Sequence, residues 1–309
     1  MEIWGEPMEV CFSKLRQRVL EAVETTDLDP LFRTFEKING PTAVTGVGGS
    51  SVVAAFLAEV LNRKNGILCT EMMPRDLRYR NMAGYENVVA CSYSGKNVGV
   101  DASFSVGLRN YLFSAGERPD AVPLRYCISE EERSFVSLAG TLIPMALTLL
   151  YYTDNDRNLL ERILQCAESL PDVIPESDVV EILYGAENRA AACFLESTFT
   201  EGGLAAAVMH EKYDYCHGRC RLNDAQGNDL IWFPEDHGLD LVFRRELGSF
   251  YGRVTEIDSG YSDPVVRDFA DTCTAMYLCR EIARNKGKDL CLKIIPPISE
   301  VLYTYAGEL

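Results

Sequence analysis

The sequence is short of positive charge. It contains 30 Lys and Arg residues against 46 Asp and Glu residues in 309, which gives a formal net charge of −16. A surface this acidic repels a polyanion, so the composition argues against a nucleic-acid partner. A small phosphate ligand is not excluded, because the N–H groups and the dipole at a helix N-terminus bind phosphate locally.

Long apolar runs are also missing. The longest, near residues 142–152, is too short to span a bilayer. Charged side chains interrupt the first twenty residues, so no signal peptide is visible. The 11 cysteines are odd in number and several lie inside apolar runs, a pattern typical of buried thiols in a reducing compartment. We therefore expect a cytoplasmic protein without a membrane partner.

Predicted helices and strands alternate in the first half of the chain. Apolar residues at helical spacing predict a helical segment over residues 8–38, which Asn39-Gly40-Pro41 ends. Strands are then expected at residues 42–45, 66–70, 87–91 and 122–128. Helices are expected at residues 52–61, within 98–113 and at about 135–152.

The alternation resumes after an acidic stretch at residues 153–187, which includes a helix at about 157–169. The later strands are expected at residues 190–195, 229–233 and 254–257, and the later helices at 202–211, 239–247 and 265–285. Such alternation is typical of βαβ units and of a mostly parallel sheet, so the predicted class is α/β.

Two loops rich in glycine and serine each follow a predicted strand. We call residues 46–51 the first Gly/Ser loop and residues 92–97 the second Gly/Ser loop. Parallel sheets bind ligands outside the carboxyl ends of their strands, glycine lets the backbone approach a phosphate, and serine hydroxyls and free N–H groups donate to its oxygens. The candidate phosphate-binding residues are Gly48, Gly49, Ser50, Ser51, Ser92, Tyr93, Ser94, Gly95 and Asn97.

Two other interpretations of these loops remain open. Both loops are also compatible with ordinary turns between strand and helix. A dinucleotide site needs Gly-x-Gly-x-x-Gly, whereas Gly46 and Gly48 are followed by Ser51, and Glu71 ends the next strand where a ribose-binding acid would lie. That interpretation leaves the second Gly/Ser loop without a role, so we favour a phosphate site.

The two phosphosugar loops of the SIS (sugar isomerase) proteins are similar to two segments of this chain, Thr45-Gly46-Val47-Gly48-Gly49-Ser50-Ser51 and Cys91-Ser92-Tyr93-Ser94-Gly95. The chain most resembles the bifunctional phosphoglucose/phosphomannose isomerases and the isomerase half of glucosamine-6-phosphate synthase. The resemblance implies two SIS-type lobes, each a mostly parallel sheet between helices in three layers. It also implies a sugar phosphate substrate, a homodimer with shared sites, and no metal or other cofactor.

On this resemblance we expect an N-terminal helical segment (1–40), a first lobe with the phosphosugar loops (41–155), and a linker, second lobe and C-terminal tail (156–309). The chain departs from the family at Asn97, where Thr is usual, and at Val98-Gly99-Val100, where acidic residues are usual. In the second lobe, the loop at residues 234–238 is acidic and lacks serine, so it would repel phosphate. We therefore expect one phosphosugar site per chain.

Interconversion of an aldose and a ketose requires ring opening, a base that moves a proton between C1 and C2, and stabilisation of the enediolate. Glu201 is expected at or just before a helix start, and the resemblance implies that it is the base. The resemblance implies that His217 opens the ring in the neighbouring subunit's site. The resemblance to the bifunctional phosphoglucose/phosphomannose isomerases implies that Arg133 is the arginine that stabilises the enediolate.

Each of these residues also has a simpler interpretation. Glu201 would favour a helix N-terminus in any protein, His217 is compatible with a structural role, and Arg133 has glutamates beside it at residues 130–132. An alternative alignment with the synthase equates Glu201 with an earlier glutamate that is not the base and puts Val208 at the base position.

Two further sets of residues were considered. Related enzymes place a C-terminal lysine near the sugar, and the sequence does not choose among Lys286, Lys288 and Lys293. A zinc site would have to use the closely spaced residues His210, Cys216, His217 and Cys220. These lack the second, separated ligand pair of structural zinc sites, so we expect no metal.

The sequence thus favours an aldose–ketose isomerase acting on a hexose or amino-sugar 6-phosphate. Two alternatives keep the same fold. One is a deglycase or deaminase that uses the same proton chemistry at C2 with an amine as leaving group. The other is a non-catalytic phosphosugar-sensing SIS protein.

Overall fold

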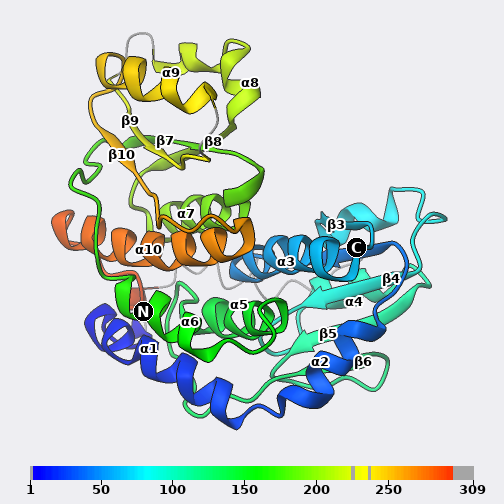
Figure 1. Cartoon of the computed structure of the whole chain (residues 1–309). Helices are drawn as coiled ribbons and strands as arrows, with labels where there is room; N and C mark the ends of the chain where they lie inside the picture. Colours follow the sequence, from blue (N-terminus) through cyan, green and yellow to red (C-terminus); the bar gives the residue numbers. More distant parts are fainter. Residues whose placement is uncertain (1–2, 224–226, 236–237, 295–309) are drawn as a thin grey trace. The chain divides into compact units, whose positions relative to one another are not determined.

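The computed structural model describes residues 3–223, 227–235 and 238–294. The chain folds into two compact units (Figure 1). Of the described residues, the first unit contains those up to Glu161 together with Cys291–Ile294, and the second unit is Arg162–Leu290. Each unit contains one parallel sheet with helices on both faces, so the predicted α/β class with three layers is confirmed.

The sheet of the first unit has five strands in the order β3-β2-β4-β5-β6, all of them parallel. The strands are β2 (Thr42–Thr45), β3 (Cys69–Met72), β4 (Asn87–Cys91), β5 (Arg109–Ser114) and β6 (Val122–Arg125). Every residue of β2 and β4 is buried, as expected for central strands covered on both faces. Because β2 and β4 are neighbours, the loops that follow them lie at the same edge of the sheet.

The helices of the first unit are α1 (Met8–Thr25), α2 (Leu28–Lys37), α3 (Gly49–Val60), α4 (Val98–Phe104) and α5 (Ala139–Tyr152). Shorter helical turns span Leu61–Asn65 and Pro74–Arg78. α5 packs against α3 and α1, whereas α4 packs against β4 and the turn at Pro74–Arg78. A short antiparallel pair, β1 (Ile3–Trp4) with β11 (Lys293–Ile294), joins the two ends of the unit.

The helical segment predicted over residues 8–38 is two helices. Thr26 between them is buried and extended, and its Oγ1 accepts a hydrogen bond from the Cys127 N–H at 2.9 Å. Asp27 then begins α2. A bond to a distant loop, which helical periodicity does not reveal, therefore separates the helices.

The second unit has a four-stranded parallel sheet in the order β10-β9-β7-β8. Its strands are β7 (Val179–Tyr184), β8 (Ala206–Glu211), β9 (Asp229–Trp232) and β10 (Val254–Glu256). Its helices are α7 (Arg189–Gly202), α8 (Lys212–Cys216), α9 (Gly238–Glu246) and α10 (Pro264–Asn285), and α6 (Arg157–Cys166) spans the boundary between the units. Single helical turns span Ala186–Asn188, Arg219–Asn223 and Leu247–Ser249.

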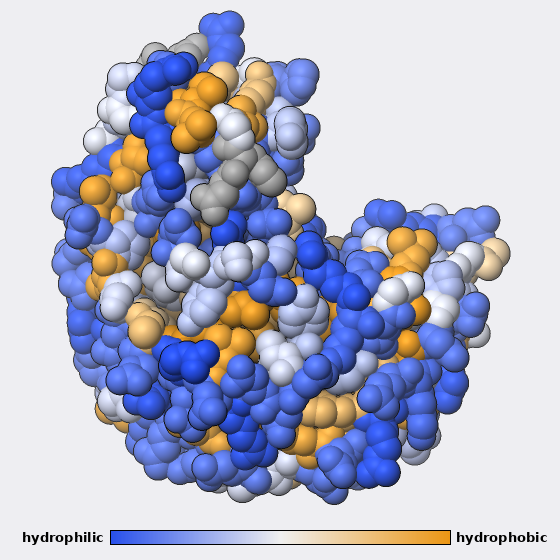
Figure 2. Space-filling model, viewed as in Figure 1, coloured by the Kyte–Doolittle hydropathy of each residue, from blue (hydrophilic) through white to orange (hydrophobic). Residues whose placement is uncertain are grey.

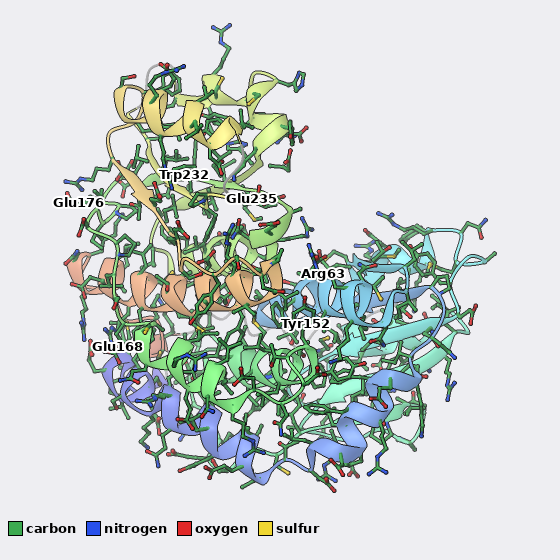
Figure 3. All side chains as sticks on the ribbon, in the orientation of Figure 1. Arg63, Tyr152, Glu168, Glu176, Trp232 and Glu235 are labelled. Carbon is green, nitrogen blue, oxygen red and sulfur yellow. The ribbon has the colours of Figure 1, made fainter. Side chains whose placement is uncertain are left out.

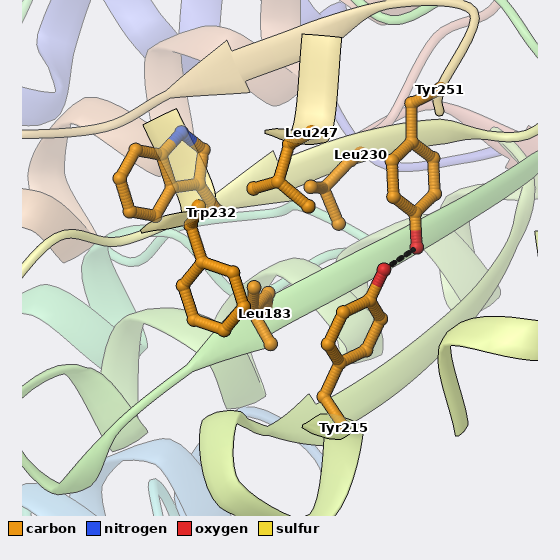
Figure 4. Close-up of a cluster of buried hydrophobic side chains, with 7 residues drawn as sticks. Leu183, Tyr215, Leu230, Trp232, Leu247 and Tyr251 are labelled. Atoms are coloured by element: carbon orange, nitrogen blue, oxygen red, sulfur yellow. Dashed lines mark hydrogen bonds between the residues drawn. The ribbon is translucent and has the colours of Figure 1, made fainter. Parts of the chain in front are cut away.

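Figure 1 shows α7 and α10 packed together on one side of this sheet, with α8 and α9 on the other. The α8–α9 side holds a buried cluster (Figure 4) formed by Leu183, Tyr215, Leu230, Trp232, Phe243, Leu247 and Tyr251. Within this cluster the hydroxyls of Tyr215 and Tyr251 are 2.7 Å apart.

Three predictions for the secondary structure were wrong. Residues 190–195 lie inside α7 rather than in a strand, the predicted helix at 202–211 contains β8, and β5 and β7 were not predicted. A short apolar run such as 190–195 fits a buried strand or a helix packed on two sides, and here α7 is covered by the sheet and α10.

The visible face of the molecule is mostly hydrophilic, with apolar side chains in small separate patches (Figure 2). This distribution agrees with the acidic composition. Within the described ranges, none of the helices has both the length and the apolar character needed to cross a membrane.

Asp271 on α10 makes the stability of the second unit depend on pH. It is fully buried and accepts hydrogen bonds from the Ser259 N–H (2.9 Å) and from Asn188 Nδ2 (2.8 Å). Burial raises its pKa from the ordinary 3.8 to about 7. The folded state therefore holds a proton that the unfolded state has released, and stability falls as pH rises through this range.

Between pH 5 and pH 7, ionisation of Asp271 lowers the unfolding free energy of the wild type. We predict that the unfolding free energy of Asp271→Asn, which cannot ionise, falls by about 2 kcal/mol less over this range. Urea unfolding of both proteins at the two pH values measures this difference. The exposed Asp172→Asn, also in the second unit, is the matched control and should behave as the wild type. An equal pH dependence in wild type and Asp271→Asn would contradict the assignment.

Candidate functional site

The first Gly/Ser loop joins the end of β2 to the start of α3. Gly46 admits no side chain, because a Cβ there would collide with the Ser50 carbonyl, and Gly48 has a positive φ of 58°. α3 begins at Gly49 with no side-chain acceptor at its N-cap, whereas Ser51 Oγ donates to the Gly48 carbonyl at 2.7 Å. The N–H groups of Ser50 and Ser51 donate to the carbonyls of Val47 (3.2 Å) and Gly48 (2.8 Å). Among the described residues, no partner accompanies the Ser50 hydroxyl, so this hydroxyl and the amides of Gly48 and Gly49 are available to an anion.

The second Gly/Ser loop joins β4 to α4 and is held by its own side chains. Ser92 Oγ accepts from the Gly95 N–H and from Asn97 Nδ2, both at 3.1 Å. Ser94 Oγ accepts from the Lys96 N–H at 3.3 Å. Asn97 Oδ1 caps α4 by accepting from the Val100 N–H at 3.0 Å. Asn97 therefore shapes the loop, and one N–H of its amide is already in use.

The two loops meet at the carboxyl ends of β2 and β4, around a depression that is too narrow to hold a water molecule. Gly46 and Val47 of the first loop and Asn97 of the second line this depression. Gly99 lies between them, because a Cβ there would be 2.9 Å from Val47 Cγ2 and 3.1 Å from Asn97 Oδ1. The structure thus brings together the two loops that the sequence singled out.

A third element, the start of α5, adjoins both loops. The Cβ position of Gly49 is 2.7 Å from Thr141 Oγ1, and that of Gly140 is 3.1 Å from the Tyr93 ring. The Glu132 carboxylate accepts the N–H groups of Leu138 (3.0 Å), Ala139 (2.9 Å) and Gly140 (3.3 Å) and so caps this helix. Burial raises the pKa of Glu132, and these N–H donors oppose the rise.

Sequence reasoning missed Glu132 and chose its neighbour Arg133. Arg133 is exposed, and its guanidinium forms no ion pair with any residue that the structure describes. Only its carbonyl is engaged, by the Glu6 N–H at 2.7 Å. The signal for Glu132 was an acidic residue shortly before an apolar helix.

Glu201 lies in the last turn of α7 and not at a helix start, so its predicted position was wrong. Its side chain reaches the surface, and Ser197 Oγ donates to Oε1 at 2.9 Å. Partial removal from water raises the pKa of Glu201, Ser197 opposes the rise, and the Glu196 charge adds to it.

Of the three C-terminal lysines, Lys288 contacts this segment. Its Nζ bonds to the carbonyl of Gly203, the left-handed residue that ends α7. Lys286 instead donates to the Ser177 carbonyl at 3.1 Å. Lys293 belongs to β11 in the first unit.

His217 is the exposed C-cap residue of α8, beyond the carboxyl end of β8. Glu201 precedes β8, a strand of six residues, which is about 20 Å long. Glu201 and His217 therefore lie at opposite ends of β8 within one chain. His210 is buried, with Nε2 3.2 Å from Glu181 Oε2, and nowhere in residues 3–223, 227–235 and 238–294 do three His, Cys, Asp or Glu side chains gather as a metal ion requires.

In the second unit, carboxylates occupy the helix start that corresponds in topology to the first Gly/Ser loop. Asp268 accepts the N–H groups of Ala190 (3.1 Å) and Ala191 (2.9 Å) at the start of α7. Glu235, labelled in Figure 3 on the loop after β9, accepts the Glu187 N–H at 2.9 Å. It also leaves no room for a Cβ at Gly185. Asp236 and His237 of this predicted acidic loop lie outside the described residues.

Comparisons with known proteins show what this chain is similar to. No protein-family model matches the sequence, and no curated protein matches it. Tagatose-6-phosphate ketose/aldose isomerase from Escherichia coli matches with a TM-score of 0.70 and 16% identity, over 93% of this chain and 96% of that one. Glucosamine-6-phosphate deaminase from Thermotoga maritima matches with a TM-score of 0.70 and 17% identity, over 90% and 96%.

The C-terminal domain of glucosamine-fructose-6-phosphate aminotransferase from Francisella tularensis matches with a TM-score of 0.65 and 16% identity, over 92% of this chain and 97% of that one. At such identities the similarity concerns the fold. The fold is that of phosphosugar isomerases and other SIS-domain proteins, which confirms the resemblance drawn from the two loops.

We predict that Glu132→Ala destabilises the protein by about 1–3 kcal/mol, because it leaves the first N–H groups of α5 without an acceptor. Glu131→Ala is the matched control, since Glu131 is exposed and adjacent. Denaturant unfolding of both variants measures the effect. Equal stability of the two variants would show that the cap contributes nothing.

Proposed function

We propose that this chain binds a hexose or amino-sugar 6-phosphate and interconverts its aldose and ketose forms through an enediol intermediate. The observation that carries the proposal is that the two Gly/Ser loops follow neighbouring parallel strands and meet at one edge of the sheet, next to a start of α3 that has no side-chain cap. N–H groups at a helix start, together with serine hydroxyls, are suited to a phosphate group. The similarity in fold to an isomerase and a deaminase of phosphorylated sugars supports this substrate class.

In this proposal the phosphate is held by the hydroxyls of Ser50, Ser92 and Ser94 and by the amides of Gly48, Gly49 and Tyr93. The Ser51 hydroxyl and the Gly95 N–H instead donate within their own loops and keep them in shape. The amide of Asn97 keeps the second Gly/Ser loop in shape and has one N–H left for the ligand. Among the described residues of the second unit, Asp268 and Glu235 already occupy the helix-start amides at the position that corresponds to the first Gly/Ser loop. One phosphosugar then binds per chain.

Glu201 is the proposed base. Partial burial raises the pKa of Glu201, which makes its carboxylate a stronger base than that of a fully solvated glutamate. His217 is proposed to open the sugar ring in the site of a second copy, because it lies at the far end of β8 from Glu201 in its own chain. The exposed Arg133 is proposed to stabilise the enediolate. The functional unit is therefore a homodimer.

Cleavage of an amine from a phosphorylated sugar is the second candidate reaction. Proton transfer at C2 is common to both reactions, and the leaving group differs. The similarity to a glucosamine-6-phosphate deaminase equals that to the isomerase in TM-score, 0.70 in each case, and favours this alternative over others.

Proton–deuterium exchange at C2, followed by NMR in heavy water across hexose and amino-sugar 6-phosphates, tests the proposal. We predict exchange with at least one sugar, and a loss of at least about 100-fold in Glu201→Gln, because general-base catalysis contributes that much. Glu168→Gln, at an exposed glutamate that is not part of the proposed site, is the control. Ammonia release instead of isomerisation would identify a deaminase, whereas binding without exchange would identify a sensor and overturn the proposed enzyme.

We predict that Gly99→Ala weakens binding of fructose 6-phosphate at least about tenfold, since the new methyl group pushes Val47 and Asn97 apart and the loops must keep their geometry. Calorimetric titration measures the affinity. Gly84→Ala is the matched control, because a Cβ at Gly84 meets nothing within 4 Å. Unchanged affinity in Gly99→Ala would place the phosphate elsewhere.

A further inference from the structure

The helix that carries His217 is too short to hold itself in place. α8 has five residues, and isolated helices of this length are unstable in water. Tyr213, Cys216 and His217 face solvent. The position of His217 therefore depends on the two buried residues of the helix, Lys212 and Tyr215.

Lys212 fixes the first residue of α8. Its side chain is 3% exposed, and its Nζ lies 3.2 Å from Glu235 Oε2 and 3.0 Å from Asp240 Oδ1. This anchor lies at the end of the helix remote from His217. The ion pairs of Lys212 therefore do not fix the orientation of the last turn of α8, which requires a second contact.

Tyr215 supplies that second anchor, two residues before His217 in the chain. Tyr251 donates its hydroxyl proton to Glu181 Oε2 at 2.9 Å, and the Tyr215 hydroxyl lies 2.7 Å from the Tyr251 oxygen. Because the only Tyr251 proton is already donated, Tyr215 is the donor between the two phenols. Burial raises the pKa of Tyr215 to about 12, so this proton stays in place at neutral pH.

The far end of this chain of hydrogen bonds is rigid. Glu181 is fully buried on β7, an inner strand of the second unit's sheet. Its Oε1 accepts a hydrogen bond from Asn228 Nδ2 at 2.9 Å. His210 Nε2 lies 3.2 Å from the other oxygen. A phenylalanine ring at position 215 would fill the apolar cluster of Figure 4 equally well. The Tyr215 hydroxyl therefore contributes little to packing, and its hydrogen bond instead fixes the orientation of the side chain.

We propose that the hydrogen-bonded chain Tyr215–Tyr251–Glu181 positions His217 for ring opening. This inference rests on the proposed function and names positioning residues for one of its steps. Proton transfer by Glu201 does not depend on them. A misplacement of about 1 Å is enough to slow an oriented reaction by orders of magnitude.

Tyr215→Phe tests the inference with the smallest disturbance, because the hydrogen bond from Tyr251 to the buried Glu181 carboxylate remains. Two substrates are compared: the cyclic ketose 6-phosphate that the wild type turns over, and its 5-deoxy analogue, which lacks the hydroxyl that closes the ring. We expect kcat on the cyclic substrate to fall about tenfold with KM unchanged, and turnover of the acyclic analogue to equal that of the wild type. Tyr213→Phe, 70% exposed on the same helix, should match the wild type on both.

Equal losses on both substrates, or no loss on either, would overturn the inference. Wild-type protein that exchanges no proton on any sugar phosphate would overturn the proposed function, and the inference with it. Thermal unfolding of each variant separates misfolding from mispositioning. If Tyr215→Phe does not fold, Tyr251→Phe interrupts the same chain and must give the same contrast between the two substrates.

Discussion

The start of each helix that follows a strand must find acceptors for its first N–H groups. Buried backbone donors without a partner are costly, so the chain has to satisfy them or leave them to a ligand. Glu132 satisfies α5, Asn97 satisfies α4 and Asp268 satisfies α7. The start of α3 has no such side chain. The Gly/Ser composition of the first loop follows from this constraint, because it combines close backbone approach with a region free of negative charge.

The two units answer the same constraint in opposite ways. In the first unit, Gly46 and Gly48 keep side chains out of the loop after β2. In the second unit, the loop after β7 also carries a glycine, Gly185, but the Glu235 carboxylate fills the space beside it. A carboxylate there resembles a bound anion, held by a backbone N–H and by Lys212. In the second unit, carboxylates of the chain itself thus occupy the positions that the first unit leaves to a ligand in the proposed function.

The sequence was sufficient for elements whose signals are local. β2 and β4 were predicted with their observed bounds, because short apolar runs ended at glycine-rich turns. It was insufficient for β7, where Glu181 interrupts the apolar pattern. That carboxylate is tolerated only because Asn228 and Tyr251, distant in sequence, donate to it. Because β7 was not predicted, the apolar run at residues 190–195 was assigned to a strand. The order of the next two elements was therefore predicted as strand then helix, whereas the structure has the helix α7 and then the strand β8.

The candidate site divides in the same way. The Gly/Ser loops were predictable from composition, whereas the environment of Glu201 required the correct order of helix and strand. That order changes the electrostatics of the proposed base. At a helix start, the positive end of the dipole would lower the carboxyl pKa, whereas at the end of α7 the negative end raises it. The dipole then acts in the same direction as partial burial and Glu196, and all three favour proton acceptance by Glu201.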